Sequence, residues 1–162
     1  MNKIPDEDCP CGSQKSYVSC CGLFITGKQH PKTPEALMRS RYTAYTMANI
    51  DYIKETMHGN ALIGFEEMDA KRWATRVHWI KLNVLKSVIE NASLGYVTFE
   101  ASFVDGARLK SIHEQSEFIC KEGRWYYVDG KHIPTSHTER MIARNMNCPC
   151  GSHRKFKNCH GI

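Results

Sequence analysis

The chain has 162 residues, of which 41% are hydrophobic and 24% charged, a composition typical of one globular domain with small appendages. Its formal net charge of +5 is too mild to indicate nucleic-acid binding by itself. The sequence contains no apolar run long enough to predict a transmembrane helix. No apolar stretch follows the lysine near the N-terminus, so it does not predict a secretory signal either. We therefore expect a cytoplasmic protein, in which clustered cysteines are more often metal ligands than disulfides.

The first predicted element is a small knuckle within residues 1–25. Cys9 and Cys11 are one residue apart, and Cys20 and Cys21 follow as an adjacent pair. So short a segment cannot bury a core, so a bound metal ion is expected to supply most of its folding energy. The spacing itself is unusual, because paired zinc ligands are commonly separated by about two to four residues.

The middle domain is predicted to span residues 30–135 and to begin with helices. Thr33-Pro34-Glu35 combines an N-cap threonine, a proline at the first helical position and an acid in the first turn. Residues 51–57 predict a second, short helix. A third is expected over residues 68–80, with an apolar face formed by Trp73, Val77 and Ile80.

The second half of the middle domain predicts strands. Alternating or β-branched segments cover residues 82–89, 94–104, 109–120 and 124–129. Turn sequences such as Asp105-Gly106 separate them. Helices followed by an antiparallel meander predict an α+β fold, with helices packed on a curved sheet.

The C-terminal segment, residues 140–162, repeats the N-terminal knuckle. Every ligand spacing recurs, and so do a proline, two glycines, a serine, a basic residue and an aromatic; the second ligand set is Cys148, Cys150, Cys159 and His160. His160 stands where the first copy has Cys21, and histidine cannot form a disulfide but does replace a thiolate at zinc. We therefore predict one zinc ion per knuckle, two per chain. Disulfides, reactive thiols and iron–sulfur ligation at the all-cysteine set are the alternatives.

Both knuckles resemble the SEC-C motif, the metal-binding tail of the SecA preprotein translocase ATPase. The resemblance lies in the ligands together with the proline, glycine and serine around them. It implies zinc binding, docking on the export chaperone SecB and contact with the ribosome. The chain contains no Walker or helicase motif, so it is not itself expected to be a translocase.

The middle domain resembles the nuclear transport factor 2-like fold, a curved sheet folded around helices as a cone. Residues 123–130, Gly-Arg-Trp-Tyr-Tyr-Val-Asp-Gly, are typical of it. The order of SEC-C motif, such a domain and a second SEC-C motif is similar to that of the YchJ family, as is the sequence of residues 37–45. This resemblance covers nearly the whole chain.

A cone of this kind can hold a pocket, and the first helix and the third carry candidates to line it: Arg39, Arg41, Tyr42 and Trp73. Either arginine can pair with an acid of the sheet, namely Glu100, Glu114 or Asp129. The competing hypothesis is an arginine that binds a ligand. No nucleophile elbow, phosphate-binding glycine loop or paired acid and base is visible, so the sequence favours a non-enzymatic role without deciding it.

The two knuckles differ in charge. Residues 1–22 carry two lysines against three acids, whereas residues 140–162 carry five basic side chains and no acid. The predicted partner-binding residues of the C-terminal knuckle are Arg154, Lys155, Phe156 and Lys157. Such a surface suits an acidic protein, a SecB-like chaperone first and the ribosome second, or an RNA backbone.

Together these features predict a zinc-binding adaptor of the SEC-C type. The alternative is a small-molecule-binding protein or enzyme that uses the pocket of the middle domain.

Overall fold

The computed structural model describes residues 7–136 and 139–161. The α-helices in this part of the chain are α1 (Cys21–Ile25), α2 (Pro34–Thr46), α3 (Ile50–Glu55), α4 (Asn60–Ile63) and α5 (Glu67–Arg76). The strands are β1 (His78–Asn91), β2 (Leu94–Asp105), β3 (Arg108–Lys121), β4 (Arg124–His132) and β5 (Glu139–Met141). Two 3-10 turns, η1 (Tyr17–Ser19) and η2 (Phe156–Asn158), belong to the knuckles. No helix of the described ranges is both long and apolar enough to cross a membrane.

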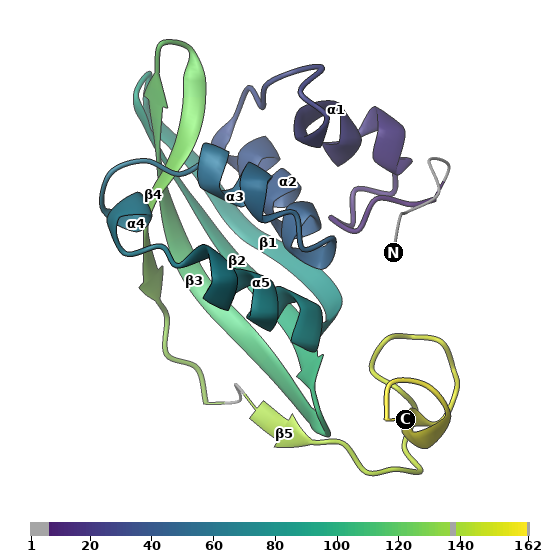
Figure 1. Cartoon of the computed structure of the whole chain (residues 1–162). Coiled ribbons are helices and arrows are strands. Elements are labelled where there is room, and N and C mark those ends of the chain that lie inside the picture. The colour runs from purple at the N-terminus through teal and green to yellow at the C-terminus, as the bar shows by residue number, and fades with distance from the viewer. Residues whose placement is uncertain (1–6, 137–138, 162) are drawn as a thin grey trace.

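The strands form one antiparallel sheet in the order β1-β2-β3-β4, and β5 pairs with the start of β3. Tight hairpins join neighbouring strands, and the hairpin between β3 and β4 places Glu122 and Gly123 at φ 54° and 78°. Two positive φ values in a two-residue loop match the twist of the strands that it joins. Figure 1 shows α2, α3 and α5 over one face of the sheet, so the predicted α+β fold is confirmed.

Helix α2 lies at the centre of the molecule. It begins where the sequence predicts, because the Thr33 hydroxyl accepts a hydrogen bond of 3.1 Å from the Ala36 amide. Its buried residues occupy almost every side of the helix, from Leu37 and Met38 to Thr43 and Ala44. On the sheet side they meet the inward residues of the strands, Leu82, Val97, Phe99, Ala101, Phe118 and Trp125. Burial of these apolar side chains provides the main driving force for folding.

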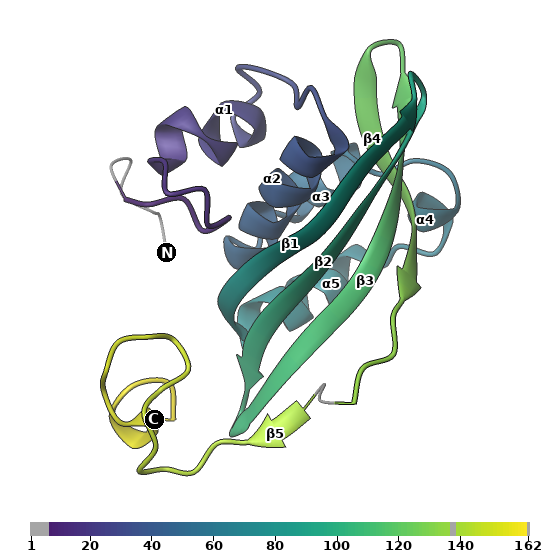
Figure 2. The ribbon, with the colours of Figure 1, turned by 180° about the vertical axis from the view of Figure 1, so that it is seen from behind.

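The two knuckles pack against the middle domain at different places. The N-terminal knuckle lies against α2, and its cysteines form one cluster with Ile25 and Met47. The C-terminal knuckle lies at the end of the sheet, where Phe156 and Ile142 contact Val104. Figures 1 and 2 show both knuckles on the side of the sheet where β1 forms the edge.

The third predicted helix ends earlier than expected. Helix α5 stops at Arg76, and Val77 is already extended with ψ 156°. His78 and Trp79, which the periodic pattern includes in the helix, pair with Val104 and Phe103 in the sheet. The physical reason is that strand β2 offers these residues hydrogen bonds and aromatic contacts that a longer helix lacks. The short elements α4 and β5 were not predicted, since neither is long enough to show a period.

Candidate metal centres and cavity

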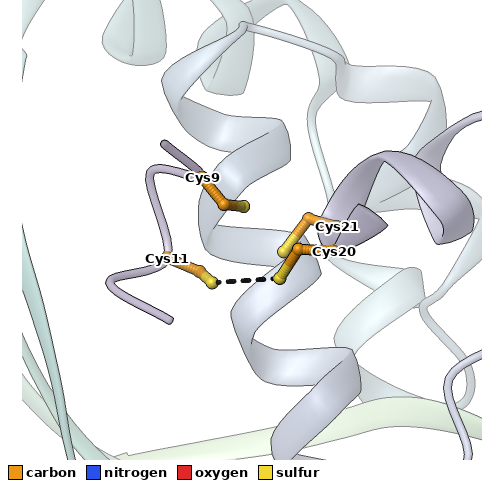
Figure 3. Close-up of side chains that lie close together, drawn as sticks. All are labelled: Cys9, Cys11, Cys20 and Cys21. Atoms are coloured by element: carbon orange, nitrogen blue, oxygen red, sulfur yellow. Dashed lines mark hydrogen bonds between the residues drawn. The ribbon is translucent and has the colours of Figure 1, made fainter. Parts of the chain in front are cut away.

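The N-terminal knuckle brings the predicted ligands together. The four sulfur atoms of Cys9, Cys11, Cys20 and Cys21 lie within 4.8 Å of one another (Figure 3). The sulfur atoms of Cys11 and Cys20 are 3.6 Å apart. Cys9, Cys11 and Cys21 are buried, whereas Cys20 is half-buried.

The C-terminal knuckle builds a similar centre with a different fourth donor. Its four ligand atoms also lie within 4.8 Å of one another. The Nδ1 atom of His160 is 3.2 Å from the Cys148 sulfur and 3.4 Å from the Cys159 sulfur. Only Cys148 is buried here, and the other three ligands are partly exposed.

The backbone of the two knuckles repeats in detail. Gly12 and Gly151 have φ 80° and 81°, a left-handed conformation that glycine adopts without strain. The amide of Cys9 donates to the carbonyl of Lys15 at 2.8 Å, and the amide of Cys148 donates to that of Arg154 at the same distance. In each copy a serine hydroxyl contacts the third ligand, Ser13 at 3.1 Å from the Cys20 sulfur and Ser152 at 3.4 Å from that of Cys159. These serines are placed to donate to a thiolate and orient it.

The recurring aromatic and the final glycine of the repeat form a close contact inside each knuckle. A Cβ atom on Gly22 would lie 2.6 Å from the Tyr17 carbonyl oxygen, and one on Gly161 would lie 2.8 Å from that of Phe156. Only glycine fits so close to a neighbouring backbone. Phe156 is 2% exposed, so its ring supports the knuckle from within. This corrects the expectation that Phe156 contacts a partner.

The donor atoms fit a tetrahedral metal ion. Zinc binds sulfur at about 2.3 Å and nitrogen at about 2.0–2.1 Å, which places neighbouring donors of a tetrahedron roughly 3.5–3.8 Å apart. The closest donor separations here, 3.6 Å in the N-terminal centre and 3.2–3.5 Å in the C-terminal centre, come close to that range. Four sulfurs, or three sulfurs and one imidazole, are donor sets that zinc prefers. The two clusters can therefore each hold one metal ion.

The pKa values of three thiols of the N-terminal centre are shifted in different directions in the absence of a cation. The hydrogen bond with Cys21 lowers the pKa of the Cys11 thiol, and the same bond raises the pKa of Cys21. Burial raises the pKa of the Cys20 thiol. A bound divalent cation reverses these costs, because its charge favours the thiolate at every ligand.

Arg39, one of the four predicted pocket residues, instead belongs to the N-terminal knuckle. Its Nη1 atom donates to the Cys11 carbonyl at 2.7 Å, and its Nη2 atom lies 3.5 Å from the carboxylate of Glu35. It does not line the cavity of the middle domain. The expectation for Arg39 is therefore corrected, and its contact ties the first ligand pair to α2.

A partly open cavity of about 400 Å³ lies between the helices of the middle domain and the inner face of the sheet. Arg41, Tyr42 and Trp73 line it, as the sequence suggests. Of the three acids considered beforehand, Glu114 and Asp129 line it and Glu100 does not. The alternation of side chains along β3 could have identified Glu114 from the sequence. Ile112, Ser116 and Phe118 line the cavity on the same face of the strand as Glu114.

The predicted basic residues of the C-terminal knuckle lie on its surface. Arg154, Lys155 and Lys157 are all exposed, and so are Arg140 and Arg144 on the segment that leads to the knuckle. Within the described residues, no carboxylate forms a salt bridge with any of these five side chains. The knuckle therefore presents a positive surface that none of the described carboxylates neutralises by an ion pair.

Comparisons with known proteins match these features. The family model described as "YchJ, middle NTF2-like domain" matches residues 33–130, and the SEC-C motif model matches residues 144–162. The chain is similar to the solution structure of a SEC-C motif-containing protein from Rhodopseudomonas palustris, with 38% identity and a TM-score of 0.73 over 79% of this chain and 100% of that chain. It is also similar to the crystal structure of a SEC-C motif-containing protein from Psychrobacter arcticus, with 25% identity and a TM-score of 0.69 over 97% of both chains.

Proposed function

Since this chain belongs to the YchJ family, we propose that it is a cytoplasmic, zinc-binding adaptor that docks on another protein through its C-terminal knuckle. The observation that carries the proposal is the unequal placement of two similar knuckles. The ligand cluster of one is buried against α2, whereas the other presents exposed basic side chains that form no salt bridge with the described carboxylates.

The buried knuckle has a structural role in this proposal. Arg39 and Thr43 of α2 contact Cys11 and Cys9, so metal binding there stabilises the packing of the N-terminal segment on the central helix. Three of its four ligands are buried, so this metal site is largely covered by the protein. The N-terminal segment also carries a small net negative charge, which does not favour an acidic partner.

The exposed knuckle has the docking role. Its metal ion orders a short segment that lacks a large core of its own, and this order fixes the positions of Arg154, Lys155 and Lys157. A preorganised set of charges binds at a lower entropic cost than a flexible tail. The resemblance to the tail of SecA makes an acidic surface of a SecB-like chaperone the first partner to test, and the ribosome the second.

The test compares a charge-reversed knuckle with a charge-reversed control. The variant is Arg154→Glu, Lys155→Glu and Lys157→Glu in one chain, and the control changes three exposed lysines elsewhere: Lys86→Glu, Lys121→Glu and Lys131→Glu. Both lower the net charge by the same amount, so only the location of the change differs. Binding to purified SecB and to ribosomes is measured by biolayer interferometry at several salt concentrations, after zinc content has been checked.

We expect the knuckle variant to lose binding, and the control variant to retain it with a modest decrease. Equal binding by the two variants would refute docking through this knuckle. Binding to ribosomal RNA alone, with affinity that falls steeply as salt rises, would replace the protein partner with an RNA backbone.

A further inference from the structure

The cavity of the middle domain has the dimensions and walls of a ligand site. Its volume is about 400 Å³, and a cavity of about 150 Å³ is known to bind benzene in another protein. The cavity can therefore accommodate a compound with one or two rings. Trp73 and Trp79 both line it and meet edge to face, with their ring centroids 5.0 Å apart. Phe99 and Tyr45 extend this aromatic wall.

A buried cation faces this aromatic wall. Arg41 is only 7% exposed, and its guanidinium carbon lies 4.6 Å from the centre of the Tyr127 ring. Its Nη1 atom donates to the Ile53 carbonyl at 2.8 Å and to the Thr56 hydroxyl at 2.6 Å. These two bonds hold the side chain in one orientation, which is the preorganisation that a binding site requires.

Apart from Nη1, the guanidinium has no hydrogen-bond partner among the described residues. Within residues 7–136 and 139–161, the Nε and Nη2 atoms of Arg41 donate no hydrogen bond, and no carboxylate forms an ion pair with it. Burial lowers the pKa of Arg41, although nearby tyrosines and Glu114 act in the opposite direction. A buried charge without a counter-ion is unfavourable, and an anionic ligand would relieve that cost.

The neighbouring polar groups also favour a ligand that accepts hydrogen bonds. The Nε1 atom of Trp79 is buried without a partner among the described residues, and an indole nitrogen can only donate. The Glu114 carboxylate already accepts hydrogen bonds from Ser116 at 2.9 Å and Tyr127 at 3.1 Å. Its charge is therefore partly stabilised by the protein, whereas the Nε and Nη2 atoms of Arg41 have no hydrogen-bond partner among the described residues.

We propose that this cavity binds a small aromatic carboxylic acid as its anion. The carboxylate accepts hydrogen bonds from the free N–H groups of Arg41, and the ring packs against Trp73, Trp79 and Phe99. A guanidinium matches a carboxylate through two parallel hydrogen bonds, which makes this contact both strong and directional. A phosphorylated ligand fits less well, because it would bring a second negative charge into a cavity that Glu114 and Asp129 already line.

This ligand site is separate from the basic surface of the C-terminal knuckle, and it goes beyond the adaptor role. Binding in the cavity can be measured without a partner protein, and docking can be measured without a ligand. Failure of one proposal therefore leaves the other intact.

The experiment is isothermal titration calorimetry on the full chain loaded with zinc. The probes are benzoate, naphthoate and indoleacetate, each compared with its uncharged amide of nearly the same shape. Wild-type protein is expected to bind at least one acid in the micromolar to millimolar range. The corresponding amide is expected to bind at least about tenfold more weakly, because it lacks the charge that Arg41 recognises.

Two variants test the site from different directions. Arg41→Lys keeps the positive charge but removes the two-pronged contact, and it should weaken the acid by at least about tenfold. Arg39→Lys is the matched control, because Arg39 lies on the same helix but outside the cavity. Ala101→Leu adds apolar bulk to the wall at a buried alanine, so it should abolish binding without touching Arg41.

Three results would overturn the proposal. They are the absence of binding by all three acids at millimolar concentration, equal affinity for an acid and its amide, and unchanged affinity after Ala101→Leu. Thermal unfolding of each variant verifies that it is folded. If Arg41→Lys fails to fold, the comparison of acid with amide on wild-type protein and the Ala101→Leu variant still decide the question.

Discussion

Replacement of Phe156 with alanine is expected to weaken metal binding by the C-terminal knuckle. The ring is 2% exposed and packs with Val104, Ile142 and Cys148. Truncation of a buried phenylalanine to alanine costs about 3–5 kcal/mol of folding free energy. Because metal binding and folding are coupled in so small a unit, most of this loss should appear in the metal affinity. Each 1.4 kcal/mol is about a factor of ten, so the affinity should fall by roughly a hundredfold to a few thousandfold.

The assay is competition for zinc against a chromophoric chelator, with the N-terminal centre serving as an internal reference. Phe156→Tyr is the matched control, because tyrosine occupies the same place in the N-terminal copy at Tyr17, where it is also buried. This control should retain affinity within about tenfold of wild type. If Phe156→Ala leaves zinc affinity unchanged and reduces partner binding instead, then the ring acts on the surface, and our placement of it in the knuckle core is incorrect.

Two further predictions concern the metal centres themselves. His160→Ala should reduce the zinc content from two ions per chain towards one. His160→Cys should keep two ions, because a cysteine, Cys21, occupies the equivalent position in the N-terminal copy. Elemental analysis of the purified proteins distinguishes these outcomes, and full zinc content in His160→Ala would exclude His160 as a ligand. When a chelator is added, the C-terminal ion should leave before the N-terminal ion, since three of the C-terminal ligands are partly exposed and three of the N-terminal ligands are buried. The order is checked by native mass spectrometry with His160→Ala as the reference for loss at the C-terminal centre, and release of both ions at one rate would contradict the structural difference between the sites.

The elements that were predicted well depend on local sequence. Thr33 and Pro34 specify the start of α2 within one turn, Thr33 through a side-chain hydrogen bond to the backbone and Pro34 through its fixed φ angle. The structure contains this N-cap. The alternating residues of β2, such as Val97 and Phe99, face the core as their period requires. Helix α5 shows the limit of this approach, because pairing with β2 outweighs the helical period of the residues after Arg76.

The two clusters of candidate metal ligands were also accessible from local sequence. Each set lies within a short segment, and comparison of the two segments shows which residues recur and that Cys21 and His160 exchange. The same comparison could not reveal what the shared aromatic does. Phe156 lies between two lysines in sequence, which suggests a surface, whereas the fold of the knuckle turns its ring inward and the lysines outward.

The sequence by itself therefore determined the two donor sets, the α+β order and the start of the central helix, because each depends on residues that are close in the chain. Only the tertiary structure decided that Arg41 faces the cavity and Arg39 the knuckle. Both positions lie on a helix that is surrounded by other elements, so helical periodicity alone does not tell which neighbour each side chain meets. The cavity combines residues of α2, α4, α5 and the four strands β1 to β4, and their contacts are made only when these distant segments pack together.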